Sequence, residues 1–150
     1  MIEARKLRLW DGRYNLVEEG LCVATWEKSH WATGGRFALG GRSFTVRANL
    51  LGDEATLTQS GGRQIATAHG FIRKNWTIEA DGTVYHFSRA APWRREEKLH
   101  DGGRRLGSVR RTSAWRGDAA ADLPGLQRVV EVFAIAMALT RWESDAGPTG

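Results

Sequence analysis

Cysteine and proline are scarce in this sequence of 150 residues, which has one cysteine, Cys22, and three prolines. A single cysteine excludes an internal disulfide and a metal site built from several thiolates. Because no Pro/Ser-rich linker divides the chain, we expect one domain over residues 1–150. The first residues, MIEARKLRLW, lack the uninterrupted apolar segment of a signal peptide. We therefore expect a cytoplasmic protein.

Motifs that carry chemistry are also missing from the sequence. It has no G-x-S-x-G elbow, H-E-x-x-H pair, P-loop or G-x-G-x-x-G segment after a strand. The histidines lack the i, i+4 spacing of a helical metal pair, and we expect surface or strand positions for all four: His30, His69, His86 and His100. The chain is predicted to be non-enzymatic and to use no metal or cofactor.

Two pairs of adjacent acids, Glu18-Glu19 and Glu96-Glu97, come nearest to paired catalytic carboxylates. Neighbours on a strand point to opposite faces, so neither pair can easily serve as a matched acid and base. We interpret both doublets as solvated turn residues. Cys22 lies in an apolar strand and is predicted to be an inert packing residue.

The longest apolar run is Val129–Leu139, which only Glu131 interrupts. It is shorter than the about 20 residues that cross a bilayer and longer than the about 5–6 residues of an ordinary strand. We predict a helix over about 122–143, with Asp122 as its N-cap and Pro124 in its first turn. The second half of this helix is apolar on every face, so it must be enclosed. Charges in its first half argue against a transmembrane segment.

The rest of the chain reads as short strands separated by glycine turns. Arg42–Leu50 alternates polar and apolar side chains strictly, as a half-buried strand requires. Dipeptides such as Asp81-Gly82 are typical of tight hairpins. We predict a mainly β fold, a closed antiparallel β-barrel of about 10–12 short strands around the hydrophobic C-terminal helix. The strands are expected over about residues 3–115, and the helix is expected to fill the barrel.

Three stretches share a recurring organisation of strands, basic-Gly and Asp-Gly turns, and a closing apolar helix. They are RSFTVRANLLGDEATLTQSGGRQIATAHGFIRKNWTIEADGTVYHFSRA, RRLGSVRRTSAW and DLPGLQRVVEVFAIAMALTRW. This organisation resembles the tubby C-terminal-like superfamily, which includes tubby domains, phospholipid scramblases, and plant and bacterial LURP-one-related proteins. The resemblance implies an antiparallel barrel around a hydrophobic C-terminal helix.

The resemblance implies a fold more firmly than an activity. Tubby domains bind phosphoinositides, and scramblases move phospholipids with calcium. This sequence has no proline-rich N-terminal segment, no cysteine cluster and no acidic D-x-D-x-D loop, so it departs from the scramblases where calcium would act. No residue of a phosphoinositide motif is carried over.

A basic segment precedes the apolar helix in a chain of formal charge +5. If 93–100 and 104–112 pair as a hairpin, its cations lie close together. Arginine forks suit phosphate oxygens, so we predict an anion- or lipid-binding site there; the alternative is a solvated strand face. The candidate residues are Arg94, Arg95, Lys98, Arg104, Arg105, Arg110 and Arg111.

The seven tryptophans are Trp10, Trp26, Trp31, Trp76, Trp93, Trp115 and Trp142. Most are expected in the core. Trp93 and Trp115 lie next to arginines and are candidates for a membrane interface.

These patterns lead to a hypothesis of a non-enzymatic binding or scaffold protein. Its expected partner is an anionic phospholipid surface, to which it would be peripheral, or another protein. One alternative is a barrel that carries a hydrophobic small molecule, which requires an empty interior. Another is a nucleic-acid-binding barrel, favoured by the positive charge and the aromatic residues.

Overall fold

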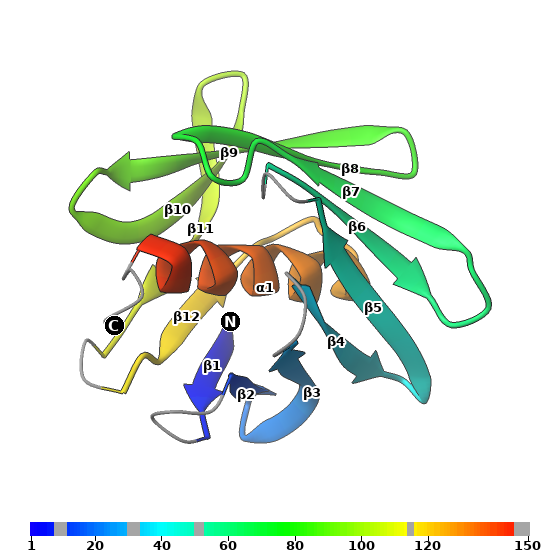
Figure 1. Ribbon diagram of the computed structural model, residues 1–150. Helices are drawn as coiled ribbons and strands as arrows, with labels where there is room; N and C mark the ends of the chain where they lie inside the picture. Colours follow the sequence, from blue (N-terminus) through cyan, green and yellow to red (C-terminus); the bar gives the residue numbers. More distant parts are fainter. Residues whose placement is uncertain (8–11, 30–33, 50–52, 114–115, 146–150) are drawn as a thin grey trace.

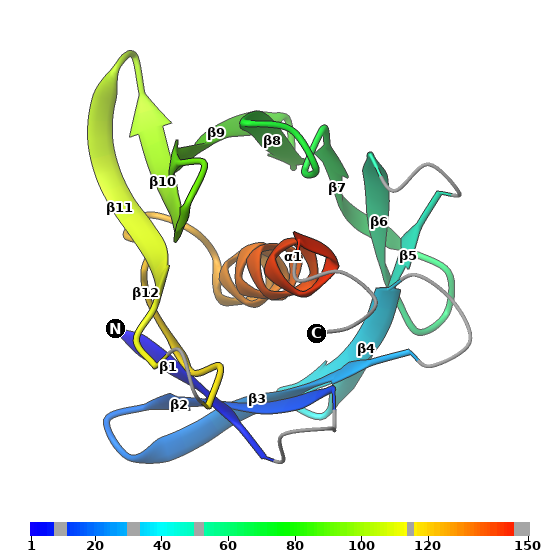
Figure 2. The same ribbon diagram turned by 60° about the vertical axis from the view of Figure 1, so that its left-hand side comes forward.

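The computed structural model describes residues 1–7, 12–29, 34–49, 53–113 and 116–145. Its strands form a closed antiparallel barrel in which β1 pairs with both β2 and β12 (Figure 1). Figure 2 shows that α1 runs through the inside of this barrel. The predicted fold class is therefore confirmed. The elements are β1 (Ile2–Lys6), β2 (Arg13–Glu18), β3 (Leu21–Lys28), β4 (Gly34–Leu39), β5 (Arg42–Ala48), β6 (Glu54–Gln59), β7 (Gln64–His69), β8 (Asn75–Ala80), β9 (Thr83–Ala91), β10 (Arg94–Asp101), β11 (Arg104–Arg111), β12 (Ala119–Asp122) and α1 (Arg128–Asp145).

Because all neighbouring strands are antiparallel, the connections alternate between the two ends of the barrel. We call one the turn end: it holds the connections after β2, β4, β6, β8, β10 and β12, and the start of α1. The other is the loop end: it holds the connections after β1, β3, β5, β7, β9 and β11, and the last turn of α1. Asp81 and Gly82 illustrate the tight turns of the turn end, because both have positive φ, 53° and 78°.

The inner face of the wall follows the strand period of two. In β5, Phe44 and Val46 are buried whereas Thr45 and Arg47 are exposed, which confirms the predicted alternation over this strand. Leu50, the last residue of that prediction, lies outside the described residues. Many other inner positions hold small side chains that leave room for a helix about 10–12 Å wide. These are Ala55, Ala66, Ala68, Ala119 and Ala121.

The predicted helix start at Asp122 is wrong. Ala119–Asp122 forms β12, which pairs with β11 and with β1 and so closes the barrel. A run of three alanines and an aspartate has no strong strand preference of its own. It becomes a strand because two neighbouring edges offer backbone partners, and tertiary context overrides propensity. The first bond of α1 runs from the Glu131 amide to the Gln127 carbonyl, at 2.8 Å.

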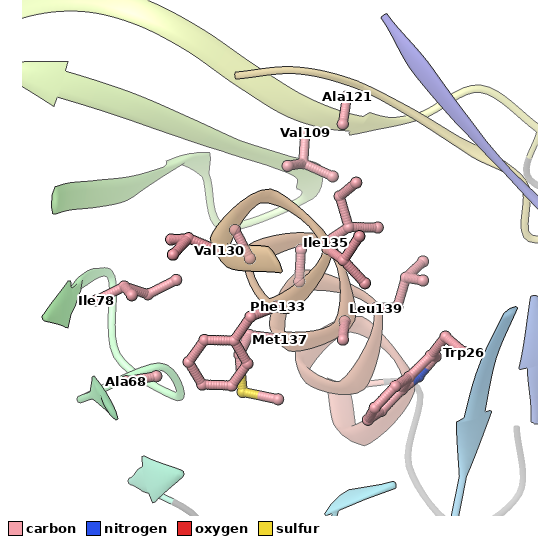
Figure 3. Close-up of a cluster of buried hydrophobic side chains, with 14 of the residues drawn as sticks. Trp26, Ala68, Ile78, Val109, Ala121, Val130, Phe133, Ile135, Met137 and Leu139 are labelled. Carbon is pink, nitrogen blue, oxygen red and sulfur yellow. The ribbon is translucent and has the colours of Figure 1, made fainter. Parts of the chain in front are cut away.

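The helix is enclosed, as its lack of a polar face predicts. Every side chain from Val132 to Trp142 is buried. Figure 3 shows Phe133 directed toward Ala68 and Ile78, and Leu139 on the side of Trp26. Burying a side chain such as Phe133, Ile135 or Leu139 stabilises the fold by about 1.5–3 kcal/mol, so the helix makes a large contribution to the core.

Candidate anion-binding face

The basic hairpin forms as predicted, from β10 and β11. Glu97 lies opposite Val109, and Lys98 lies opposite Ser108. Strand alternation divides the seven predicted cations between two sides of the wall. Five lie on the outer face or at the turn: Arg94, Lys98, Arg104, Arg105 and Arg110. The remaining two, Arg95 and Arg111, reach the end of α1.

Glu96 organises part of the outer group. Its carboxylate lies 3.2 Å from Arg94 Nε and 3.4 Å from Arg105 NH2, and only 5% of Glu96 is exposed. Arg105 also donates to Ser108 Oγ at 3.2 Å. Two of the five outer cations are therefore already paired. Within the described residues, Lys98, Arg104 and Arg110 have no ion-pair partner.

The interpretation of Glu96-Glu97 as a solvated doublet is wrong. The two side chains do point to opposite faces, but Glu96 is covered by arginines and Glu97 is 0% exposed inside the barrel. Glu97 Oε1 accepts from Trp76 Nε1 at 2.9 Å and from Arg141 NH1 at 3.1 Å. Its Oε2 accepts from Trp142 Nε1 at 2.9 Å. This carboxylate joins β8, β10 and α1.

Arg95 and Arg111 both contact Trp142, near the C-terminal end of α1, to which Glu97 also binds. Arg95 NH1 donates to the Trp142 carbonyl, and the Arg111 guanidinium lies 5.4 Å from the centre of the Trp142 ring. Burial lowers the pKa of Arg111 from its ordinary value. Cations at a helix C-terminus complement its partial negative charge. These two residues therefore stabilise α1. Of the five outer cations, Arg94 and Arg110 lie near the loop end, whereas Arg104 and Arg105 lie at the turn end.

Glu143 adds a second anchor at the loop end. Its carboxylate accepts from the Tyr14 hydroxyl at 2.9 Å and from Lys28 Nζ at 3.0 Å. Burial, reinforced by the Glu143 charge, raises the pKa of Tyr14 above its ordinary range. Residues of β2 and β3 thus hold the end of α1 in addition to Glu97 of β10.

The tryptophan prediction is confirmed for Trp26, Trp76 and Trp142, which are buried. Trp93 is 86% exposed, in the connection between β9 and β10. Ile72 and Leu7 are also exposed at the loop end, at 49% and 46%. The remaining tryptophans, Trp10, Trp31 and Trp115, lie outside the described residues.

Cys22 is exposed, so its prediction as a packing residue is wrong. It lies at the start of β3, next to the turn end of the barrel.

A groove of about 480 Å³ on the outer face of β7–β10 is the main feature that sequence reasoning missed. Three histidines line it: His69, His86 and His100. His86 lies directly opposite His100, and Thr77 lies between His86 and His69. Each is a strand residue, as expected, but their convergence was not predicted. The fourth histidine, His30, lies outside the described residues. Counting the pairing of β8 with β9 outward from the Asp81-Gly82 turn places Thr77 opposite His86, and this count could have revealed part of the convergence.

Ser88, Arg73, Asn75 and Thr77 add further polar side chains to the groove. Ser88 Oγ and His100 Nε2 are 2.5 Å apart. In the described part of the chain, no group of three or more His, Cys, Asp or Glu residues is placed to hold a metal ion. The side chains that line the groove supply hydrogen-bond donors and the guanidinium of Arg73.

The structure is a closed β-barrel with an internal helix, and the loop end of this barrel is basic and partly apolar. Comparisons with family models, curated proteins and solved structures gave no match for the chain. Within the described residues, no helix combines the length and apolar character needed to cross a membrane.

Proposed function

We propose that this chain is a tubby-like, non-enzymatic binding protein that attaches peripherally to anionic phospholipid surfaces through its loop end. The observation that carries the proposal is Trp93, which is 86% exposed beside Arg94. Tryptophan prefers the membrane–water interface, and neighbouring cations attract anionic head groups by about 1 kcal/mol each.

The surroundings of Trp93 have the same character. Ile72 is half-exposed and is followed by the exposed cations Arg73 and Lys74. The Arg89 amide donates to the Lys74 carbonyl at 2.8 Å, which ties this loop to the strand that leads to Trp93. Apolar side chains flanked by cations suit insertion into the head-group region.

The two alternatives have less support. In a carrier barrel the ligand occupies the interior, and here α1 fills that space with the buried side chains from Val132 to Trp142. A single-strand nucleic-acid surface uses exposed aromatic platforms for stacking. Three of the four described tryptophans are buried, which leaves Trp93 as the exposed one among them.

Vesicle co-sedimentation tests the proposal. Full-length protein is mixed with phosphatidylserine-containing or purely phosphatidylcholine vesicles at low and high salt. We expect binding that requires the anionic lipid and weakens as salt screens the charges. Failure to bind either vesicle at low salt would contradict membrane attachment and direct the search to protein partners.

Two charge-matched triple variants locate the surface. Lys74→Gln/Arg110→Gln/Arg116→Gln removes three exposed cations near the loop end, and Arg42→Gln/Arg63→Gln/Arg104→Gln removes three at the turn end. At about 1 kcal/mol per cation, the loop-end variant should bind roughly 100-fold more weakly. Equal weakening by the turn-end variant would show that only net charge matters.

A further inference from the structure

We propose that the groove on the outer face of β7–β10 binds a phosphate monoester through His86, His100, Ser88 and Arg73. This inference goes beyond membrane attachment and does not depend on it. The groove has room for a phosphoryl group and part of the molecule that carries it, at about 480 Å³.

The strand register places the donors together. His86 and His100 are direct cross-strand neighbours, and Ser88 lies opposite Lys98 on the same face. Side chains directly opposite on one face have Cβ atoms about 4.5–5.5 Å apart, so one anion can reach both imidazoles. The short contact of 2.5 Å between Ser88 Oγ and His100 Nε2 brings a hydroxyl and an imidazole together on the outer face of the barrel. His86, Ser88 and His100 lie on the neighbouring strands β9 and β10 (Figure 2), whereas Arg73 lies in the connection between β7 and β8.

The cations that can face an anion in the groove are Arg73, which lines it, and Lys98, which flanks Ser88. Arg105 lies opposite His100 but is already paired with Glu96. Three other acids lie nearby. Glu54 of β6 is 3.7 Å from His69 Nδ1, Glu79 lies on the outer face of β8, and Asp101 ends β10. Because Glu54 engages His69, the anion is expected on the opposite side, between His86 and His100.

The donor set matches a phosphate monoester better than a metal ion. Imidazoles, a guanidinium and a hydroxyl donate hydrogen bonds to phosphate oxygens, and a guanidinium fork fits them geometrically.

Titration with inorganic phosphate, followed by the NMR signals of the histidine rings, tests the site at constant ionic strength. We expect saturable shifts for His86 and His100 at pH 6.5. His86→Gln and Arg73→Gln should each weaken binding at least tenfold. Arg47→Gln, which removes an exposed cation from β5 on another part of the wall, should leave it unchanged. Non-saturable shifts, or equal loss in all three variants, would overturn the proposal.

Vesicles distinguish a lipid source from a soluble one. Phosphatidic acid carries a phosphate monoester, whereas phosphatidylglycerol carries only a diester. A preference for phosphatidic acid that His86→Gln removes would support a lipid head group as the ligand. Saturable binding of inorganic phosphate without that preference would support a soluble phosphate ester. Absence of both would overturn the site and leave the general attraction to anionic vesicles untouched.

Discussion

The two ends of the barrel differ in charge although they belong to one continuous sheet. Counting each connection and the two element residues on either side, the described part of the loop end has twelve Lys or Arg and four Asp or Glu. The turn end has five Lys or Arg and six Asp or Glu. The excess of positive charge therefore gathers at the loop end, where Trp93 is exposed.

The two ends also hold the helix differently. At the turn end, Arg128 pairs with Glu18 at 2.6 Å and with Glu131 at 2.9 Å, all on partly exposed side chains. At the loop end, the buried Glu97 receives Trp76, Arg141 and Trp142. The comparison teaches that the basic end is also the rigidly anchored end, so a binding surface there rests on a fixed support.

The largest effect is expected in the middle of the helix, between the two ends. Ala136→Arg places a charge where the side chain is 0% exposed, and a buried unpaired charge is strongly unfavourable. We expect loss of cooperative folding, measured by circular dichroism and thermal denaturation. Val129→Arg, at the half-buried turn end of α1, is the control and should fold. A folded Ala136→Arg protein would contradict the enclosed helix.

Glu97→Gln compares the two anchors directly. It removes the carboxylate opposite Arg141, and breaking a buried ion pair costs about 3–5 kcal/mol. We expect a fall of about 10 °C in melting temperature, on the scale of 2–4 °C per kcal/mol for a protein of this size. Glu18→Gln at the turn end should change the melting temperature little, because the pair is partly exposed. Similar falls in melting temperature for Glu97→Gln and Glu18→Gln would show that the two ends of the barrel hold the helix equally.

Tyr14 supplies a pH test of the loop-end anchor. Its pKa is raised in the folded protein, so above about pH 10 the unfolded chain loses a proton that the folded chain keeps. Stability should fall as the pH rises above 10, with a contribution of at most about 1.4 kcal/mol per pH unit. Urea denaturation of Tyr14→Phe should show a shallower alkaline slope than the parent. Identical slopes would mean that burial and the Glu143 charge do not raise the pKa of Tyr14 in the folded protein.

The smallest expected effect concerns stability at acid pH and the ion pair between Glu18 and Arg128 at the turn end. The hydrogen bond from Arg128 lowers the pKa of Glu18, so its contribution is present at neutral pH and is lost as the pH falls through the ordinary range of a carboxylate. The half-buried Glu131 opposes this, because burial raises its pKa. We expect Glu18→Gln to flatten the acid limb of a urea-stability profile slightly. An unchanged acid limb would leave this pair without a measurable role.

Local patterns predicted the barrel and its helix well. Strict alternation in β5 and the unbroken apolar face of α1 each follow from one stretch of sequence. β12 could not be predicted in this way, because an alanine run becomes a strand only when β1 and β11 offer partners on both sides. Because Asp122 was assigned to the helix and not to β12, the helix was predicted to start at Asp122, whereas α1 begins at Arg128.

The candidate sites depended on long-range geometry and were less predictable. The β10–β11 hairpin was recognised from its turn, but the opposite directions of Arg95 and Lys98 matter only once α1 is inside the barrel. Glu97 resembles a solvated acid until Trp76, Arg141 and Trp142 surround it. The histidine groove requires the register of four strands at once, and local sequence gives that register only near tight turns.

The orientation of the barrel on a membrane tests the central claim most directly, and the chain offers a convenient probe position. Cys22 is the single cysteine, and it is exposed near the turn end. An environment-sensitive fluorophore on Cys22 reports that end. The double substitution Cys22→Ser/Thr112→Cys moves the same fluorophore to an exposed position at the loop end and keeps Trp93. Both proteins are mixed with anionic vesicles.

We predict that the fluorophore at position 112 shifts to shorter wavelength and gains intensity on binding, whereas the fluorophore on Cys22 keeps its solvent-exposed emission. A shift on Cys22 with none at position 112, in protein that binds the vesicles, would contradict a membrane-facing loop end.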